Sequence, residues 1–113
     1  MEAMSAIIRE QNTVRELYNF ICISENLKPI LIKFCKTGKG GACVVYSGKK
    51  CNSIHIDLNN TSIGSAYVLC HEIAHQILIT SCGDAKHGKE FKKICKTLEK
   101  KYVNCNVAKK LIF

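Results

Sequence analysis

The stretch His71-Glu72-Ile73-Ala74-His75 constrains this chain more than any other, because it places two imidazoles one helical turn apart. Four residues advance an α-helix by about 6 Å and turn it by about 40°, so both imidazoles project from one face. Two imidazole nitrogens arranged in this way can close on one zinc ion at about 2.0–2.1 Å each. Glu72 lies about 100° round the helix, where its carboxylate can reach a water on that ion. The motif therefore predicts a helix that carries a metal and a base.

A catalytic zinc site usually has three protein ligands, so a third is needed beside the two histidines. His87 is the candidate, because Gly83 is a typical helix stop and a short polar turn, Asp84 to Lys86, leads towards it. A second helix that begins near His87 would carry its imidazole back over the first helix. Glu99, on that downstream helix, is the alternative third ligand, as in thermolysin-like sites.

Hydrophobic periodicity divides the remaining chain into helices and short strands. We expect helices over residues 4–27, from residue 63 or 65 to 81, and over 87–102. We expect strands over residues 30–35, 42–47 and 53–58, with a strand or tail over 104–113. The strands follow one another through glycine-containing turns, which predicts an antiparallel meander. One of them is expected to align an extended substrate beside the metal by backbone pairing. His55 is either a substrate-facing residue or an exposed strand histidine without such a role.

The motif residues together resemble the SprT-like metalloprotease family, which includes the bacterial SprT proteins and the eukaryotic Spartan proteases. The residues that match are His71, Glu72, His75, His87, Gly88 and Phe91. Together with the expected helices and strands, the resemblance indicates an α+β, zincin-like fold with an N-terminal helix and a three-stranded antiparallel sheet. It further implies an HExxH helix and a C-terminal helix that carries the third ligand. It spans roughly residues 7–102, although only the histidine stretch is specific.

The length of 113 residues predicts one domain, residues 1–113, with a single core. No apolar run approaches the length of a membrane span, and the N-terminus has no signal-peptide pattern. We therefore expect an intracellular monomer, cytoplasmic or nuclear, without membrane contact. The eight cysteines include no CxxC pair, so no C-terminal zinc ribbon is expected. They are predicted to be small apolar core residues, with a disulfide framework as the alternative.

The net charge is +8, and all but two of the 17 basic residues are lysines. Such a charge suits a polyanionic partner, although lysine-rich solvated surfaces are also common. The predicted last helix is crowded with lysines, which are either a solvated face or a contact with DNA. The candidate nucleic-acid-binding residues are Lys89, Lys92, Lys93, Lys96 and Lys100.

The leading functional hypothesis is a zinc-dependent endopeptidase that cleaves protein substrates. One zinc ion would be held by His71, His75 and His87, and Glu72 would take the proton of the attacking water. Spartan-type members cleave proteins attached to DNA, so the resemblance implies DNA-associated proteins or DNA–protein crosslinks as substrates and a role in DNA repair.

Two other functional classes remain open at this stage. The first is a catalytically silent, zinc-stabilised nucleic-acid-binding module, against which the intact Glu72 argues. The second is a partner subunit of a larger enzyme. The group that stabilises the oxyanion is not identified, and Tyr67, Tyr102 and Lys86 are the side chains considered for it.

Overall fold

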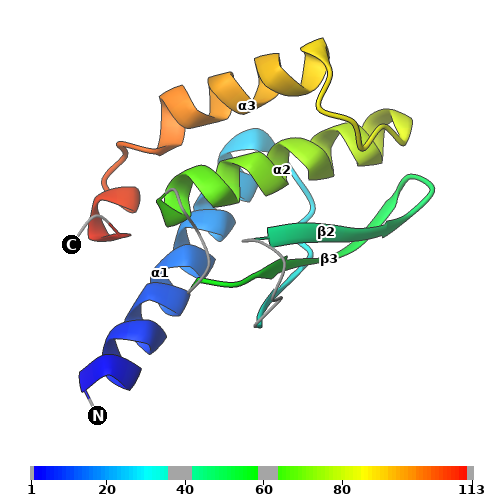
Figure 1. The fold of residues 1–113 in the computed structure, drawn as a ribbon. Helices are drawn as coiled ribbons and strands as arrows, with labels where there is room; N and C mark the ends of the chain where they lie inside the picture. Colours follow the sequence, from blue (N-terminus) through cyan, green and yellow to red (C-terminus); the bar gives the residue numbers. More distant parts are fainter. Residues whose placement is uncertain (1, 36–41, 59–63, 112–113) are drawn as a thin grey trace.

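The structure, a computed structural model, describes residues 2–35, 42–58 and 64–111 (Figure 1). In chain order the elements are α1 (Glu2–Glu25), β1 (Leu31–Phe34), β2 (Ala42–Ser47), β3 (Lys50–Ile56), α2 (Ser65–Cys82), α3 (Lys89–Tyr102) and the 3-10 helix η1 (Ala108–Leu111). This arrangement confirms the predicted α+β class. In the described part of the chain, no helix combines the length and the apolar character needed to cross a lipid bilayer.

The three strands form a mixed sheet, and the prediction of an antiparallel meander is wrong. The strand order is β1-β3-β2, so β3 lies in the centre. β3 pairs antiparallel with β2 but parallel with β1, with Ile32 opposite Ile54 and Phe34 opposite Ile56. The meander assumed that strands adjacent in the sequence are adjacent in the sheet, which holds only about two-thirds of the time. Both β1 and β2 are therefore edge strands of the described sheet.

A tight hairpin joins β2 to β3 and makes the third strand longer than predicted. Ser47 pairs with Lys50, so only Gly48 and Lys49 form the turn. Gly48 has φ of 59°, a conformation that glycine adopts without a steric penalty and that two-residue hairpins favour. Two segments with a clear sequence signal lie outside the described residues: 37–41, whose glycines predict a turn, and 59–62, whose Asn, Thr and Ser residues predict helix capping.

Helix α2 is the central layer of the molecule, with the sheet on one side and α3 on the other (Figure 1). Most of its side chains are buried, including Leu69, Ile73 and Ile79, each at most 1% exposed. Being covered on two sides explains why its sequence is apolar almost all round rather than along one stripe. Any catalytic side chain on α2 is consequently held in a packed element.

Helix α1 braces this layer through an apolar stripe at helical spacing. The stripe, which is fully or almost fully buried, consists of Val14, Leu17, Tyr18, Ile21 and Cys22. A buried polar contact adds specificity, because the Tyr18 hydroxyl donates to Gln76 Oε1 at 2.9 Å. Gln76 Nε2 in turn donates to the Lys28 carbonyl at 3.0 Å. This network fixes α2 against the α1–β1 connection at the residue that follows His75.

Candidate metal centre

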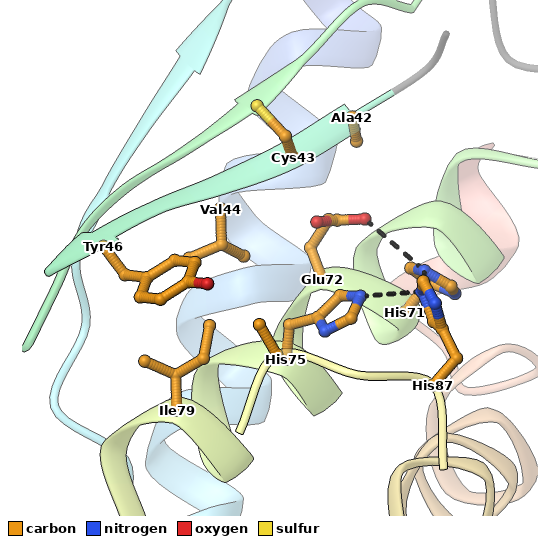
Figure 2. Close-up of a pocket in the computed structure, with 10 residues that line it drawn as sticks. Ala42, Cys43, Val44, Tyr46, His71, Glu72, His75, Ile79 and His87 are labelled. Atoms are coloured by element: carbon orange, nitrogen blue, oxygen red, sulfur yellow. Dashed lines mark hydrogen bonds and ion pairs between the residues drawn. The ribbon is translucent and has the colours of Figure 1, made fainter. Parts of the chain in front are cut away.

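Three imidazoles meet above α2 (Figure 2). His87 Nε2 lies 3.0 Å from His75 Nε2 and 3.2 Å from His71 Nε2. Each histidine offers one nitrogen, and these atoms all lie within 4.8 Å of one another. His75 is buried, His71 is half-buried and His87 is exposed, so the cluster opens towards solvent on one side.

The local chain path explains how His87 reaches the pair on α2. Gly83 ends the helix with φ of 72°, and its N–H donates to the Ile79 carbonyl at 2.9 Å. Asp84 Oδ1 then accepts from the Lys86 N–H at 2.9 Å, which tightens the following turn. The expectation that a helix carries the third imidazole is wrong, because α3 begins at Lys89 and His87 belongs to the connection before it. The glycine at position 88 serves as the N-cap of α3.

The donor set fits a zinc ion. Four ligands at 2.0–2.1 Å in tetrahedral geometry place neighbouring ligand atoms about 3.3–3.4 Å apart. The separations of His87 Nε2 from the other two nitrogens, 3.0 and 3.2 Å, are close to this value. Burial and the neighbouring histidines lower the pKa of His75 to about 4, and burial followed by His87 lowers that of His71. Both imidazoles are therefore neutral at pH 7, the form that binds metal. The ring nitrogen of a metal-binding histidine that does not bind the metal usually donates a hydrogen bond. In His75 this nitrogen is Nδ1, which is buried and has no hydrogen-bond partner among the described residues.

The ring of Phe91, on the first turn of α3, packs against all three imidazoles. Its centroid lies 4.9 Å from that of His71, 4.4 Å from that of His75 and 4.8 Å from that of His87. Phe91 is itself only 4% exposed. Helix α3 thus contributes no ligand, but its Phe91 ring forms the apolar wall that orients the three imidazoles.

Glu72 is buried beside the cluster, with 4% of its surface exposed. Its Oε2 lies 4.0 Å from His71 Nε2, and Glu72 is not among the three residues whose ligand atoms gather, so its carboxylate is placed to act on a water beside the cluster (Figure 2). Burial raises the pKa of this carboxyl to about 7. A carboxyl whose pKa lies near neutrality is suited to accept and return a proton.

A cavity of about 250 Å³ opens over the cluster. Its lining residues are Ala42, Cys43, Val44, Tyr46, His71, Glu72, His75, Ile79, Ala85 and His87. One wall is formed by β2, the edge strand nearest to α2 (Figure 2). The arrangement therefore combines three metal-binding nitrogens, a buried carboxyl and an open strand edge around a single space.

Residues 24–110 match the SprT-like family. The chain belongs to this family. No curated protein and no solved structure gives a significant match to the chain. The match runs from before β1 to beyond the end of α3 and so includes every lining residue of the cavity. Membership implies a metalloprotease, and the histidine cluster of this SprT-like chain is consistent with a zincin-like site.

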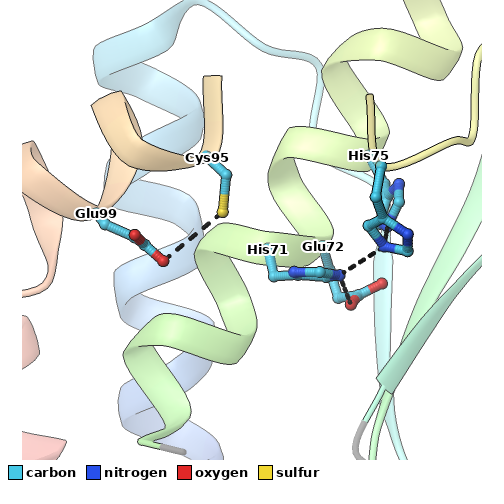
Figure 3. Close-up of polar contacts among 6 residues, drawn as sticks. His71, Glu72, His75, Cys95 and Glu99 are labelled. Atoms are coloured by element: carbon cyan, nitrogen blue, oxygen red, sulfur yellow. Dashed lines mark hydrogen bonds and ion pairs between the residues drawn. The ribbon is translucent and has the colours of Figure 1, made fainter. Parts of the chain in front are cut away.

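Glu99, the alternative third ligand, is not brought into the cluster of the SprT-like chain. Glu99 lies two helical turns beyond Phe91 on the same face of α3, where its carboxylate accepts from Cys95 Sγ at 3.7 Å, apart from the three nitrogens (Figure 3). The side chains considered for the oxyanion also lie elsewhere. Tyr102 donates to Glu25, and neither Tyr67 nor Lys86 lines the cavity.

The predicted nucleic-acid-binding lysines lie together on the outer face of α3. Lys89, Lys92, Lys93, Lys96 and Lys100 are all exposed. Helical geometry places them within an arc of about 100°, opposite the buried face. None of them forms an ion pair with a described acidic residue, whereas Lys101 pairs with Glu25 at 3.2 Å. His55 lies on β3 and contacts Ser53 Oγ at 3.0 Å, and it does not line the cavity.

Sequence reasoning missed the cavity wall. Val44, Tyr46 and Ile79 line it. Ile79 lies four residues after His75, so the i, i+4 rule was the signal that could have found it. No local signal marked β2 as the strand beside the metal, because strand order depends on long-range pairing.

Proposed function

We propose that this protein is a zinc-dependent endopeptidase that cleaves protein substrates. The observation that carries the proposal is the convergence of three histidine Nε2 atoms beside a buried carboxyl in an open cavity. Three protein ligands with a free fourth position are typical of catalytic zinc, whereas structural zinc usually has four protein ligands. Membership of the SprT-like family supports the same conclusion.

The proposed chemistry is divided between the ion and the chain. Zinc, held by His71, His75 and His87, would supply a Lewis acid that activates water and polarises a peptide carbonyl. Glu72 accepts the proton of the attacking water at Oε2 and donates it to the leaving amine. Phe91 holds the three imidazole rings in their relative orientation and excludes water from their buried side.

An extended substrate segment is proposed to pair with β2. Within the described sheet β2 has only β3 as a neighbour, so its other edge is available for backbone hydrogen bonds. The same strand forms one wall of the cavity. A peptide added to this edge would run past Glu72 and the histidines in an extended conformation, the form in which a peptide bond is most accessible to attack.

The decisive test compares the wild-type protein with Glu72→Gln after both have been loaded with zinc. Glutamine preserves the shape of the side chain but cannot take the proton, so we expect unchanged zinc content and a loss of casein cleavage of about 10²–10⁴-fold. His87→Ala is expected to lose zinc as well as activity. Zinc content would be measured by mass spectrometry of the purified proteins. Undiminished cleavage by Glu72→Gln would reject the assignment.

A second candidate function, binding of nucleic acid, is favoured by the lysine stripe on α3. We define the stripe as Lys89, Lys92, Lys93, Lys96 and Lys100, which span about 16 Å along the helix. A row of exposed cations without acidic partners suits a phosphate backbone. In the peptidase this stripe would recruit DNA-associated proteins or DNA–protein crosslinks, as expected for DNA repair. In a catalytically silent module, zinc would serve only to stabilise the fold.

The DNA-recruited peptidase and the catalytically silent module are distinguished by measuring DNA binding and protein cleavage on the same samples. Charge reversal of Lys92, Lys93 and Lys96 should weaken binding of single-stranded DNA, measured by fluorescence anisotropy, and reduce its salt dependence. Charge reversal of Lys49 and Lys50, on the β2–β3 hairpin, is the matched control. Unchanged DNA affinity in the stripe variant would remove the second candidate, and casein cleavage by the wild type would exclude the silent version.

A further inference from the structure

The cavity continues beyond the imidazoles into an apolar end. Val44 and Tyr46 of β2 and Ile79 of α2 line this end (Figure 2). Ile79 is 1% exposed and forms a fixed floor, whereas Tyr46 is 43% exposed and forms the rim. A register shift between Val45 and Tyr46 brings Cys51 opposite Tyr46.

The same register shift anchors this end of the hairpin to α2. The thiol of Cys51 approaches the Gln76 carbonyl at 3.8 Å and Thr80 Oγ1 at 3.7 Å. Bulges of this kind redirect side chains and are frequent next to active sites. The spacing between Tyr46 and α2 is therefore set by the fold, even though the tyrosine itself is partly exposed.

The position of the apolar end relates it to a substrate residue. Ile79 follows His75 by one helical turn, which places it about 6 Å further along α2. Side chains on one face of an extended peptide recur about every 6.6–6.8 Å. A peptide whose carbonyl faces the histidines would therefore direct the side chain of a residue flanking the cleaved bond towards Ile79 and Tyr46.

The chemistry of this end selects the kind of side chain. Its walls are two aliphatic side chains and one aromatic ring, and the charged residue among the described lining residues is Glu72, at the metal end. A lysine or aspartate side chain placed here would lose hydration and gain no oppositely charged partner among Val44, Tyr46 and Ile79. A large aliphatic or aromatic side chain would instead remove apolar surface from water.

We propose that Val44, Tyr46 and Ile79 form a specificity subsite that accepts a large apolar side chain, of leucine or phenylalanine size, next to the cleaved bond. This inference rests on the proposed peptidase function and adds the substrate class. It assigns to Tyr46 the role of the adjustable wall, because its side chain can be changed without opening the buried core.

The test uses the zinc-loaded full chain and internally quenched peptides that differ at one position. Cleavage sites in casein, mapped by mass spectrometry, first locate the position that flanks the cleaved bond. Peptides with leucine, phenylalanine, alanine, lysine or aspartate at this position are then compared. We expect kcat/KM for leucine and phenylalanine to exceed that for the other three by at least about tenfold, the usual effect of lost apolar contacts in a pocket.

Two variants and a binding measurement make the assignment specific to Tyr46. Tyr46→Ala should lower kcat/KM for the leucine peptide by about tenfold and that for the alanine peptide by less than about twofold. Val45→Ala is the matched control, since Val45 is the 41% exposed neighbour on β2 and does not line the cavity. In a Glu72→Gln background, the leucine peptide should bind more tightly than the lysine peptide by fluorescence anisotropy.

The possible results separate this inference from the proposed function. Equal cleavage of all five peptides, or the same selectivity in Tyr46→Ala as in the wild type, would overturn the subsite and leave the peptidase intact. Absence of cleavage of casein and of every peptide by the zinc-loaded wild type would overturn the proposed function and the subsite with it.

Discussion

Replacement of Phe91 by leucine should separate the support of the metal ligands from the general stability of the core. The ring is 4% exposed and touches all three imidazoles, with centroid distances between 4.4 and 4.9 Å. Leucine retains an apolar side chain of sufficient size for α3 to pack on α2, but it cannot reproduce the three ring contacts. The variant is therefore expected to fold and to hold its histidines less rigidly.

The magnitude follows from those contacts. Each aromatic pair contributes about 0.5–1.5 kcal/mol beyond its buried area, so three pairs set an upper range of about 1.5–4.5 kcal/mol. Only part of this contact energy contributes to the affinity for zinc, because the ring also packs against the imidazoles in the metal-free protein. Loss of groups that orient metal ligands typically weakens affinity by about 10–100-fold, or about 1.4–2.8 kcal/mol. We expect Phe91→Leu to raise the Kd for zinc within that range.

The assay is competition for zinc against a chromogenic chelator, with thermal unfolding of the metal-free protein measured in parallel. Leu98→Val is the matched control, because Leu98 is 1% exposed on the same helix and makes no ring contact with the histidines. The control should lower the unfolding temperature and leave the Kd for zinc within about twofold of the wild type. If Phe91→Leu behaves like the control, the reasoning that gives this ring a role at the ligands is refuted.

Two further predictions concern the fold around the site. Glu25 accepts hydrogen bonds from Tyr102 and Lys101, and these lower its pKa from 4.5, the Tyr102 bond most strongly. Its contribution to stability is therefore complete above pH 4.5 and is lost as the pH falls through the lowered value, so the difference in unfolding free energy between wild type and Glu25→Gln should shrink between pH 6 and pH 3. Gly83→Ala should cost about 1–2 kcal/mol because φ is 72°. Gly88→Ala, at φ of −79° with open space around it, should cost less than about 1 kcal/mol in urea unfolding, because only the preference of an N-cap for glycine over alanine is lost.

The helices and the candidate ligands could be predicted because their signals are local. The spacing of Val14, Leu17 and Ile21 identifies α1 without reference to any other part of the chain. α2 ends at Cys82, one residue beyond the expected position, and Gly83 caps it as expected, since glycine enters the left-handed region easily. The two histidines on α2 share a face by helical geometry alone, and the helix stop at Gly83 with the short turn after it pointed to His87, in agreement with the family motif.

The sheet and the cavity wall depend on contacts between distant residues, which no local pattern reports. β1 reads equally well as the partner of β2 or of β3, and only the packing of Ile32 and Ile54 beneath the helices decides for β3. Tyr46 reads as a strand residue with no special role until α2 is placed beside it. The start of α3 was misplaced by two residues because a histidine next to a glycine does not distinguish the first helical turn from the loop before it.

His87 lies in the connection between α2 and α3 rather than in a helix, so zinc binding by the three histidines would affect the stability of the folded chain. An ion shared by His71, His75 and His87 would act as a removable cross-link across the turn between the last two long helices. At a zinc concentration of one hundred times Kd, such a cross-link adds about 2.7 kcal/mol to the unfolding free energy. Chelation would then loosen the connection first, so limited digestion of the metal-free protein should begin at residues 83–88.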